Sequence, residues 1–193
     1  TTYDESWIED IEQNIVKFGS IIYQKRTEYI LIINRILKEL IVTNHFSQKF
    51  YLKIYDQFLY NHPMIFEDQD MYLSKIKNNR KIDFFSGGCT IGPHRSDILG
   101  FSLENNFNIN QFSTGQQKTA ILLIIISQCK YLIDSLKLKP IILLDEVCSH
   151  LDNINRELLL YLINDLDVQV FMTGTEESFF SFLSTKANYC NIN

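Results

Sequence analysis

Two adjacent carboxylates, Asp145 and Glu146, follow directly on an apolar run at residues 141–144, just after Pro140. Such a run is typical of a strand buried in a parallel sheet, and ligands bind at the carboxyl ends of such strands. One carboxylate can hold Mg²⁺ through its water shell, and its neighbour can orient or deprotonate an attacking water. The pair predicts part of a nucleoside-triphosphate site with Asp145 as the magnesium residue; the alternative is an ordinary acidic strand end.

A turn of small residues, formed by Ser113, Thr114, Gly115 and Gln116, precedes a long apolar segment that we predict to be a buried helix. The first turn of a helix carries unpaired N–H groups and a partial positive charge, so it attracts anions. Ser113 can cap this helix or donate its hydroxyl to a phosphate oxygen, and Gly115 allows close approach of a ligand. The alternative is an ordinary helix N-cap without a ligand.

The sheet edge that carries Asp145 is expected to gather further polar residues. Residues 168–171 read as the next buried strand, parallel to the first, with a helix at 154–162 as the right-handed crossover. Thr173 and Thr175 then fall at the same edge, where their hydroxyls can reach a phosphate or a water. Alternatively, Thr175 simply caps a following helix.

The short turn between that edge and the crossover helix contains Ser149 and a third carboxylate, Asp152. In the simplest interpretation this turn is the N-cap of the helix at 154–162. Its position after Asp145 and Glu146 makes a contribution to the same site the competing interpretation.

The rest of the chain is predicted to position these residues. We expect long helices over 8–36, with apolar residues at spacings of three and four, then a strand at 50–55 and a helix at 68–79. The Gly-rich stretch at 86–88 marks a break, and 98–103 with 107–109 reads as a β-hairpin. His94 and Arg95 follow Gly92-Pro93 in a shaped loop, where Arg95 could pair with a local carboxylate.

Composition limits the class of protein. The 193 residues carry a net charge of −5, with 46% hydrophobic and 13% aromatic residues, which excludes disorder and argues against a strong DNA binder acting alone. We expect no membrane-spanning run, and the four widely spaced cysteines fit reduced thiols rather than a metal site. The predicted strands leave an apolar sheet face uncovered.

Taken together, the motifs resemble the C-terminal half of an ABC-type ATPase head and, more narrowly, the RecF family in the SMC-like branch. The resemblance covers about residues 86–180 and rests on five stretches: 92–97, 113–118, 141–146, 149–152 and 169–175. It implies an α/β fold, a P-loop NTPase sheet plus a helical lobe, with 1–85 as the helical arm (lobe II) and 86–193 as the C-terminal part of the head. Phe112 and Thr114 depart from the family signature, which has Leu and Gly there.

The resemblance also implies roles for the residues. Ser113, Thr114, Gly115 and Gln116 would contact ATP held by an opposing subunit, whereas Asp145 and Glu146 would serve the ATP of their own subunit, with Mg²⁺. Ser149 and Asp152 would form the D-loop at the interface, and Thr173 or Thr175 would stand where transporters carry a switch His. His94 and Arg95 would take a DNA-facing or inter-lobe role.

At the level of function, the resemblance implies an ATP-dependent homodimeric clamp on DNA at single-strand gaps or gap junctions. It would act in the cytoplasm in recombinational repair, replication-fork maintenance and the SOS response, with RecR and RecO, and help to load RecA. The chain has no Gly-rich loop ending in Gly-Lys-Ser/Thr and begins with Thr1, so we expect a fragment whose weak ATPase needs the full-length dimer. The alternatives are a transporter ATPase subunit and a non-catalytic structural fragment.

Overall fold

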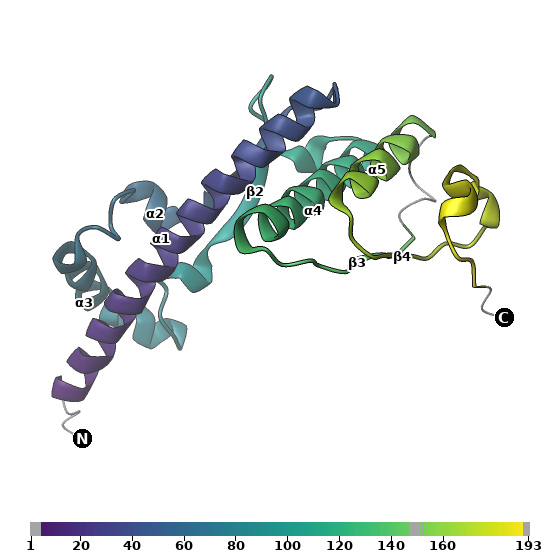
Figure 1. The fold of residues 1–193 in the computed structure, drawn as a ribbon. Helices are drawn as coiled ribbons and strands as arrows, with labels where there is room; N and C mark the ends of the chain where they lie inside the picture. The colour runs from purple at the N-terminus through teal and green to yellow at the C-terminus, as the bar shows by residue number, and fades with distance from the viewer. Residues whose placement is uncertain (1–4, 147–150, 152, 191–193) are drawn as a thin grey trace. The chain divides into compact units, whose positions relative to one another are not determined.

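The computed structural model describes residues 5–146, 151 and 153–190 (Figure 1). The chain divides into two compact units. The first comprises Thr1–Leu31 with Leu52–Gly100, and the second comprises Ile32–Tyr51 with Phe101–Asn193. The two carboxylates and the small-residue turn belong to the second unit, whereas His94 and Arg95 belong to the first.

Helix α1, Glu5–Thr43, is one continuous helix of 39 residues (Figure 1). One side of it is buried, through Val16 and Tyr23 in the first unit and Ile33, Leu37 and Leu40 in the second, whereas Ile11, Phe18 and Ile22 of the predicted apolar stripe are exposed. The predicted helical segment is confirmed. The segment forms one helix rather than several, because no turn interrupts the hydrophobic spacing before Asn44.

After α1 the chain forms β1 (Phe50–Tyr55), at the division between the two units, and then α2 (Gln57–Asn61) and α3 (Gln69–Ser86) of the first unit. Asp56 and Asp68 cap α2 and α3 by accepting backbone N–H hydrogen bonds, and Gly87 ends α3 in the left-handed conformation (φ 70°) that glycine adopts without strain. The core that these elements share consists of Val16, Tyr23, Ile65, Tyr72 and Ile76.

Strand β2, Asp97–Ser102, pairs with β1 in a two-stranded sheet. The predicted tight turn is present, because Ser102 N–H donates to Phe107 O at 2.9 Å and Asn106 takes a positive φ of 54°. The second strand of the predicted hairpin is reduced to one antiparallel bridge between Phe101 and Asn108. The prediction that residues 107–109 form the partner strand was therefore wrong. The strand that forms a sheet with β2 is β1, which is distant in sequence.

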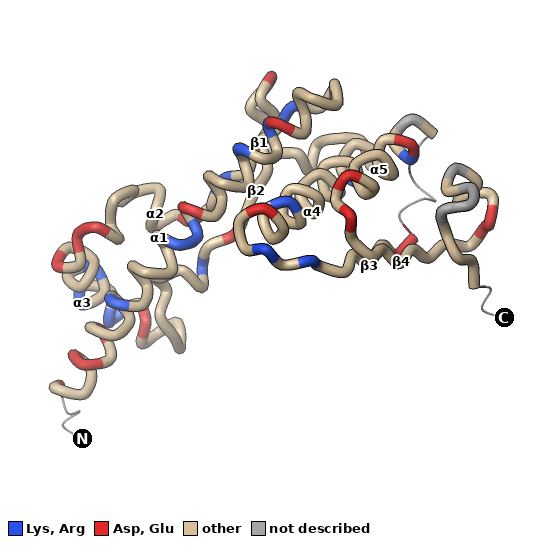
Figure 2. The backbone as a smooth tube through the Cα atoms, in the orientation of Figure 1, with Lys and Arg blue, Asp and Glu red and all other residues tan. Residues whose placement is uncertain are grey.

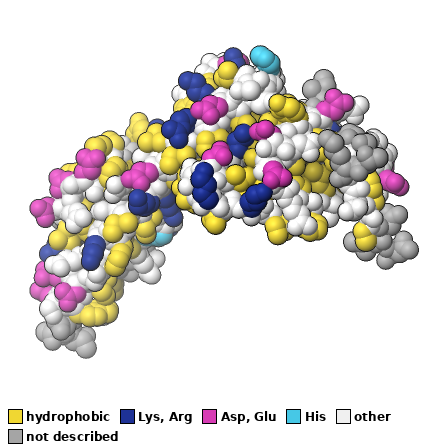
Figure 3. Space-filling model, viewed as in Figure 1, with side chains coloured by type: hydrophobic (Ala, Val, Ile, Leu, Met, Phe, Trp, Pro, Cys, Tyr) yellow, Lys and Arg dark blue, Asp and Glu magenta, His cyan; other side chains and the backbone are white. Residues whose placement is uncertain are grey.

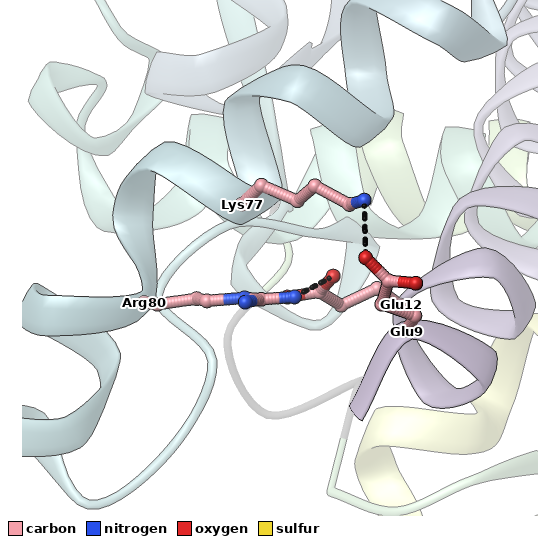
Figure 4. A network of polar contacts seen from close by, with 4 residues as sticks. All are labelled: Glu9, Glu12, Lys77 and Arg80. Carbon is pink, nitrogen blue, oxygen red and sulfur yellow. Dashed lines mark hydrogen bonds and ion pairs between the residues drawn. The ribbon is translucent and has the colours of Figure 1, made fainter. Parts of the chain in front are cut away.

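Two ion pairs join α1 to α3 in the first unit (Figure 4). Arg80 Nε and Nη2 donate to the two carboxylate oxygens of Glu12 at 2.6 and 2.7 Å, and the Glu12 side chain is only 5% exposed. Lys77 Nζ lies 3.0 Å from Glu9, and its hydrogen bond lowers the pKa of that carboxyl group. The fork of Arg80 thus neutralises a buried carboxylate.

Replacing Arg80 with Ala should therefore destabilise the first unit. The substitution leaves the Glu12 carboxylate buried without its cation, which costs about 3 kcal/mol of unfolding free energy. Urea denaturation followed by circular dichroism measures the change. Lys77→Ala is the matched control, because its pair with Glu9 is exposed and should contribute little. Equal losses from both variants would contradict the special role of the Arg80–Glu12 pair.

The second unit is an α/β arrangement in which α4 (Thr114–Leu136) packs against α5 (Asn153–Leu166), as Figure 1 shows. Strands β3 (Ile142–Leu144) and β4 (Val170–Met172) are parallel, with Leu143 opposite Phe171. The chain ends in a 3₁₀ segment, η4 (Glu177–Lys186). The two predicted parallel strands and the intervening helix are confirmed, each within four residues of its expected bounds. The prediction that both strands are buried is wrong, because Leu143 is exposed and no residue of β4 is fully buried.

One face of the β3–β4 pair is exposed. Ile142 and Leu144 are buried, but Leu143 is 74% and Phe171 53% exposed. Figure 3 shows that hydrophobic side chains reach the surface of the molecule. Parallel sheets are usually covered on both faces. The exposure of Leu143 and Phe171 therefore confirms the predicted uncovered apolar face.

Helix α4 is long and apolar enough, by length and composition, to cross a membrane, with a mean hydropathy of 1.5. The prediction that no segment of the chain reaches this limit was wrong by this measure, because the apolar residues of α4 outweigh its few charged ones, Lys118, Lys130 and Asp134. Core helices pass the same test. Leu122, Leu123 and Ile126 of α4 are buried and line one small cavity with Leu159 and Leu162 of α5, so its apolar side is occupied within the unit.

Candidate nucleotide site

The turn that begins α4 is built as a capping box. Ser113 Oγ accepts the N–H of Gln116 at 3.3 Å, and the Gln116 side-chain oxygen accepts the N–H of Ser113 at 2.9 Å. Two backbone donors are thereby satisfied reciprocally. The predicted cap is confirmed, and Ser113 and Thr114 remain exposed at the positive end of the helix.

Gly115 leaves the first turn of α4 open. A Cβ atom built at this position would meet no heavy atom within 4 Å, so the space in front of the backbone is free. One turn later, the buried Thr119 hydroxyl donates to the Gly115 carbonyl at 3.0 Å. This bond faces the helix interior and leaves the outer side of the turn available to a ligand.

Gln117 fixes the segment that leads into this turn. Its side-chain amide donates to Asn110 O at 2.8 Å and to Phe112 O at 2.9 Å. The segment is a 3₁₀ turn, η2 (Ile109–Gln111), capped by the side chain of Asn108. No role was predicted for Gln117. The signal for it was weak, since an amide that follows a cap is also common on the surface of a helix.

At the end of β3, Asp145 and Glu146 meet Thr173, which follows β4. The Thr173 hydroxyl donates a short hydrogen bond to Asp145 Oδ1 and accepts the backbone N–H of Glu146 at 3.1 Å. Thr173 N–H continues the ladder to Leu144 O at 3.0 Å. Glu146 has a positive φ of 52°, so the chain turns sharply where the two carboxylates stand. The structure thus brings together three of the predicted residues.

The other predicted residues of this edge are placed differently. Thr175 is exposed and forms no hydrogen bond with another described residue, and the N-cap of η4 is Glu176 rather than Thr175. Ser149 and Asp152 lie outside the described residues. Among the described parts of the chain, no three acidic, His or Cys side chains converge as a metal cluster. Magnesium held mainly through water needs only one or two carboxylates, so the Asp145 edge still fits that ion.

The small-residue turn of α4 and the carboxylate edge are two separate groups. One lies at the start of α4, and the other lies at the ends of β3 and β4. Each group offers one half of what a triphosphate requires: backbone N–H donors for phosphate oxygens in one, and carboxylates for a metal and a water in the other.

His94 and Arg95 occupy a 3₁₀ turn, η1 (Pro93–Arg95), in the first unit, and both are exposed. None of the described carboxylates forms an ion pair with Arg95, so the local-partner interpretation is wrong: Asp97 instead accepts the N–H of Ile98 at 2.7 Å. Lys and Arg are interspersed with Asp and Glu along the chain (Figure 2). Of the basic residues of α3, Lys77 and Arg80 are paired with Glu9 and Glu12.

No protein-family model matches the chain. Comparison with curated proteins finds the DNA replication and repair protein RecF of Rhizobium johnstonii, 29% identical over 98% of this chain and 51% of that protein. The protein of the same name from Rhizobium leguminosarum bv. trifolii is 30% identical over 96% of this chain and 50% of its own length. The chain spans about half the length of the curated relatives it matches.

Two of the solved structures that resemble the chain are also structures of RecF. A structure of the recombination mediator protein RecF-ATP in the RecFOR pathway superposes with a TM-score of 0.70 and 21% identity, covering 91% of this chain and 46% of that one. A second RecF structure gives 0.68 at 20% identity, covering 91% and 47%. These matches confirm the predicted fold, part of an ABC-type ATPase head with a helical lobe.

Proposed function

We infer that this chain belongs to the RecF family, because its similarity to proteins of that name extends over nearly all of its length. We propose that it supplies half of an ATP-dependent DNA clamp that acts in replication and repair. In this proposal residues 1–85 are the helical lobe and 86–193 the C-terminal part of the ATPase head. The observation that carries it is the Asp145–Thr173–Glu146 group at the end of two parallel strands.

The capped turn of α4 fits the phosphates of ATP. The exposed Ser113 and Thr114, the open space at Gly115 and the N–H groups of the first turn form an anion-binding surface without a carboxylate of its own. We assign Ser113, Thr114, Gly115 and Gln116 to the ATP held by a second copy of the protein. The turn and the carboxylate edge lie on different elements, which is consistent with this division between subunits.

The carboxylate edge fits magnesium and the attacking water of the same subunit's own nucleotide. Bound magnesium would offset the charge of the phosphates. Asp145 would hold the ion through water, and Thr173 fixes the orientation of that carboxylate. Glu146 would accept the proton of the water. Thr173 and Thr175 are the candidates for sensing the phosphate, and Ser149 and Asp152 for the D-loop between subunits.

The wider role follows from the family. RecF relatives are named for DNA replication and repair, and a RecF structure is described as a mediator in the RecFOR pathway. We therefore propose a cytoplasmic homodimer that binds DNA at single-strand gaps or gap junctions, contributes to the SOS response, and works with RecR and RecO to load RecA. The transporter and structural-fragment alternatives are not favoured by these similarities.

DNA binding in the presence of different nucleotides tests the proposal. The full-length protein that contains this chain should bind a gapped duplex at least about tenfold more tightly with ATP than with ADP, since nucleotide that binds the dimer stabilises it by mass action. Fluorescence anisotropy of a labelled duplex, at a fixed salt concentration and with Mg²⁺, measures the two affinities. Equal affinities in ATP, ADP and no nucleotide would contradict an ATP-dependent clamp.

A further inference from the structure

The turn at residues 92–96 of the first unit, in which His94 and Arg95 are exposed, is held by hydrogen bonds to three other segments. Arg26 of α1 donates a short hydrogen bond to the Pro93 carbonyl. His94 Nε2 lies 2.8 Å from Cys89 O, and because a carbonyl only accepts, this nitrogen is the donor. Ser96 Oγ donates to Asp56 Oδ2 at 2.7 Å.

Asp56 is the centre of this anchoring. It is only 4% exposed, and its two carboxylate oxygens accept from Tyr23 Oη at 2.8 Å, from Ser96, and from the N–H groups of Phe58 and Leu59 at 2.9 and 3.1 Å. Burial and the neighbouring Asp56 raise the pKa of Tyr23 well above its usual range, so the phenol remains a donor. The buried carboxylate thus connects α1, the start of α2 and the turn.

Gly92 makes the turn possible at its first residue. Its φ of 142° lies in the region that side chains rarely adopt, and a Cβ atom there would lie 3.1 Å from His94 Nδ1. The residue that follows is the buried Pro93, whose φ is fixed by its ring. The backbone of the turn therefore has little freedom, and the anchors remove most of what remains.

The only long cationic side chain that the turn presents is Arg95. It is exposed, and none of the described residues pairs with its guanidinium group, whereas Arg80 and Arg26 are engaged. A guanidinium on a rigid backbone binds a phosphate at low entropic cost, since its planar fork matches two phosphate oxygens.

We propose that Arg95 is a preorganised contact to one backbone phosphate of DNA, and that Asp56 and Ser96 are its positioning residues. This inference rests on the proposed DNA-binding function and gives that function a specific contact. The chain is acidic overall, and Lys77 and Arg80 of α3 are paired with Glu9 and Glu12, so a cation held on a fixed backbone is a favourable way to contact DNA.

Salt titration of DNA binding tests the contact. Arg95→Ala should reduce the slope of log affinity against log salt by about 0.9, the value for one phosphate contact. Arg35→Ala, which removes another exposed arginine, is the matched control and should leave the slope unchanged. If Arg95→Ala alters neither slope nor affinity while the wild type binds DNA, the proposal is overturned, and an acidic protein segment becomes the ligand to test for this turn.

A double-mutant cycle tests the positioning. Ser96→Ala should weaken DNA binding about fivefold in the wild-type background and less than about twofold when Arg95 is already Ala, because coupled residues are non-additive. Additive losses would overturn the positioning role. Thermal unfolding of each variant shows that the change in affinity is not loss of folding.

Hydrogen exchange provides a readout that does not depend on DNA. The amides of Arg95 and Ser96 donate within the turn, to Gly92 O at 3.0 Å and Pro93 O at 3.2 Å. They should exchange faster in Ser96→Ala, while amides in the middle of α3 keep their protection. Unchanged exchange would contradict the positioning role even if Arg95 binds DNA. If the wild type binds no DNA at all, the proposed function and the phosphate contact both fail, and exchange alone decides whether Ser96 holds the turn.

Discussion

Replacing Glu146 with Gln should slow ATP hydrolysis by the full-length dimer about 10²- to 10⁴-fold, the usual contribution of a general base. The glutamine side chain has the shape of the glutamate side chain. Residue 146 can keep its backbone conformation, and its backbone N–H can still donate to Thr173 Oγ1. It cannot accept the proton of the attacking water. Release of phosphate in a single turnover measures the chemical step directly.

The same substitution should leave ATP-dependent association intact, because Glu146 is assigned to water and not to binding. Glu157→Gln is the matched control: it makes the same change at an exposed glutamate of α5 and should hydrolyse ATP at the wild-type rate. A loss of less than about threefold in Glu146→Gln would rule out this residue as the base.

Ser113→Asp should abolish ATP-dependent dimerisation. Aspartate is as good an N-cap as serine, so α4 should still begin at Thr114 and the fold should be kept. Its negative charge, however, would stand where the proposed site receives a phosphate of the partner's ATP, and like charges at this distance repel. Sedimentation velocity with Mg-ATP separates monomer from dimer.

Ser113→Thr is the control for this experiment, since threonine keeps both the cap and the hydroxyl and should still dimerise. Circular dichroism should be the same for both variants. Dimerisation of Ser113→Asp at the wild-type ATP concentration would mean that the turn of α4 does not bind a phosphate.

The local features of the fold were predictable from the sequence. The apolar run before Asp145 and the apolar spacing in the crossover helix identify β3 and α5, because burial imposes these patterns. Ser113 and Gly87 mark helix ends through their capping chemistry, which depends only on adjacent backbone. The candidate site residues that lie on these elements could therefore be predicted together with them.

Contacts between distant segments were not predictable in this way. The hydrogen bond between Tyr23 and Asp56 joins residues 33 apart, and the Arg80–Glu12 pair joins residues 68 apart. Nothing in the local pattern distinguishes a buried aspartate from a simple cap, or a paired arginine from a solvated one. The partner of β2 was predicted wrongly for the same reason. Its pairing with β1 depends on the whole topology and not on the adjacent sequence.

In the proposed dimer, each ATP site combines Glu146 of one subunit with Ser113 of the other. Mixing the two inactive variants, Glu146→Gln and Ser113→Asp, tests whether the site is shared in this way. If the site is shared, a mixed dimer carries both defects in one site and none in the other, so the mixture should hydrolyse ATP although neither variant does alone. If both residues serve the same subunit's ATP, every site carries a defect. A mixture no more active than its components would therefore rule out an ATP site shared between subunits.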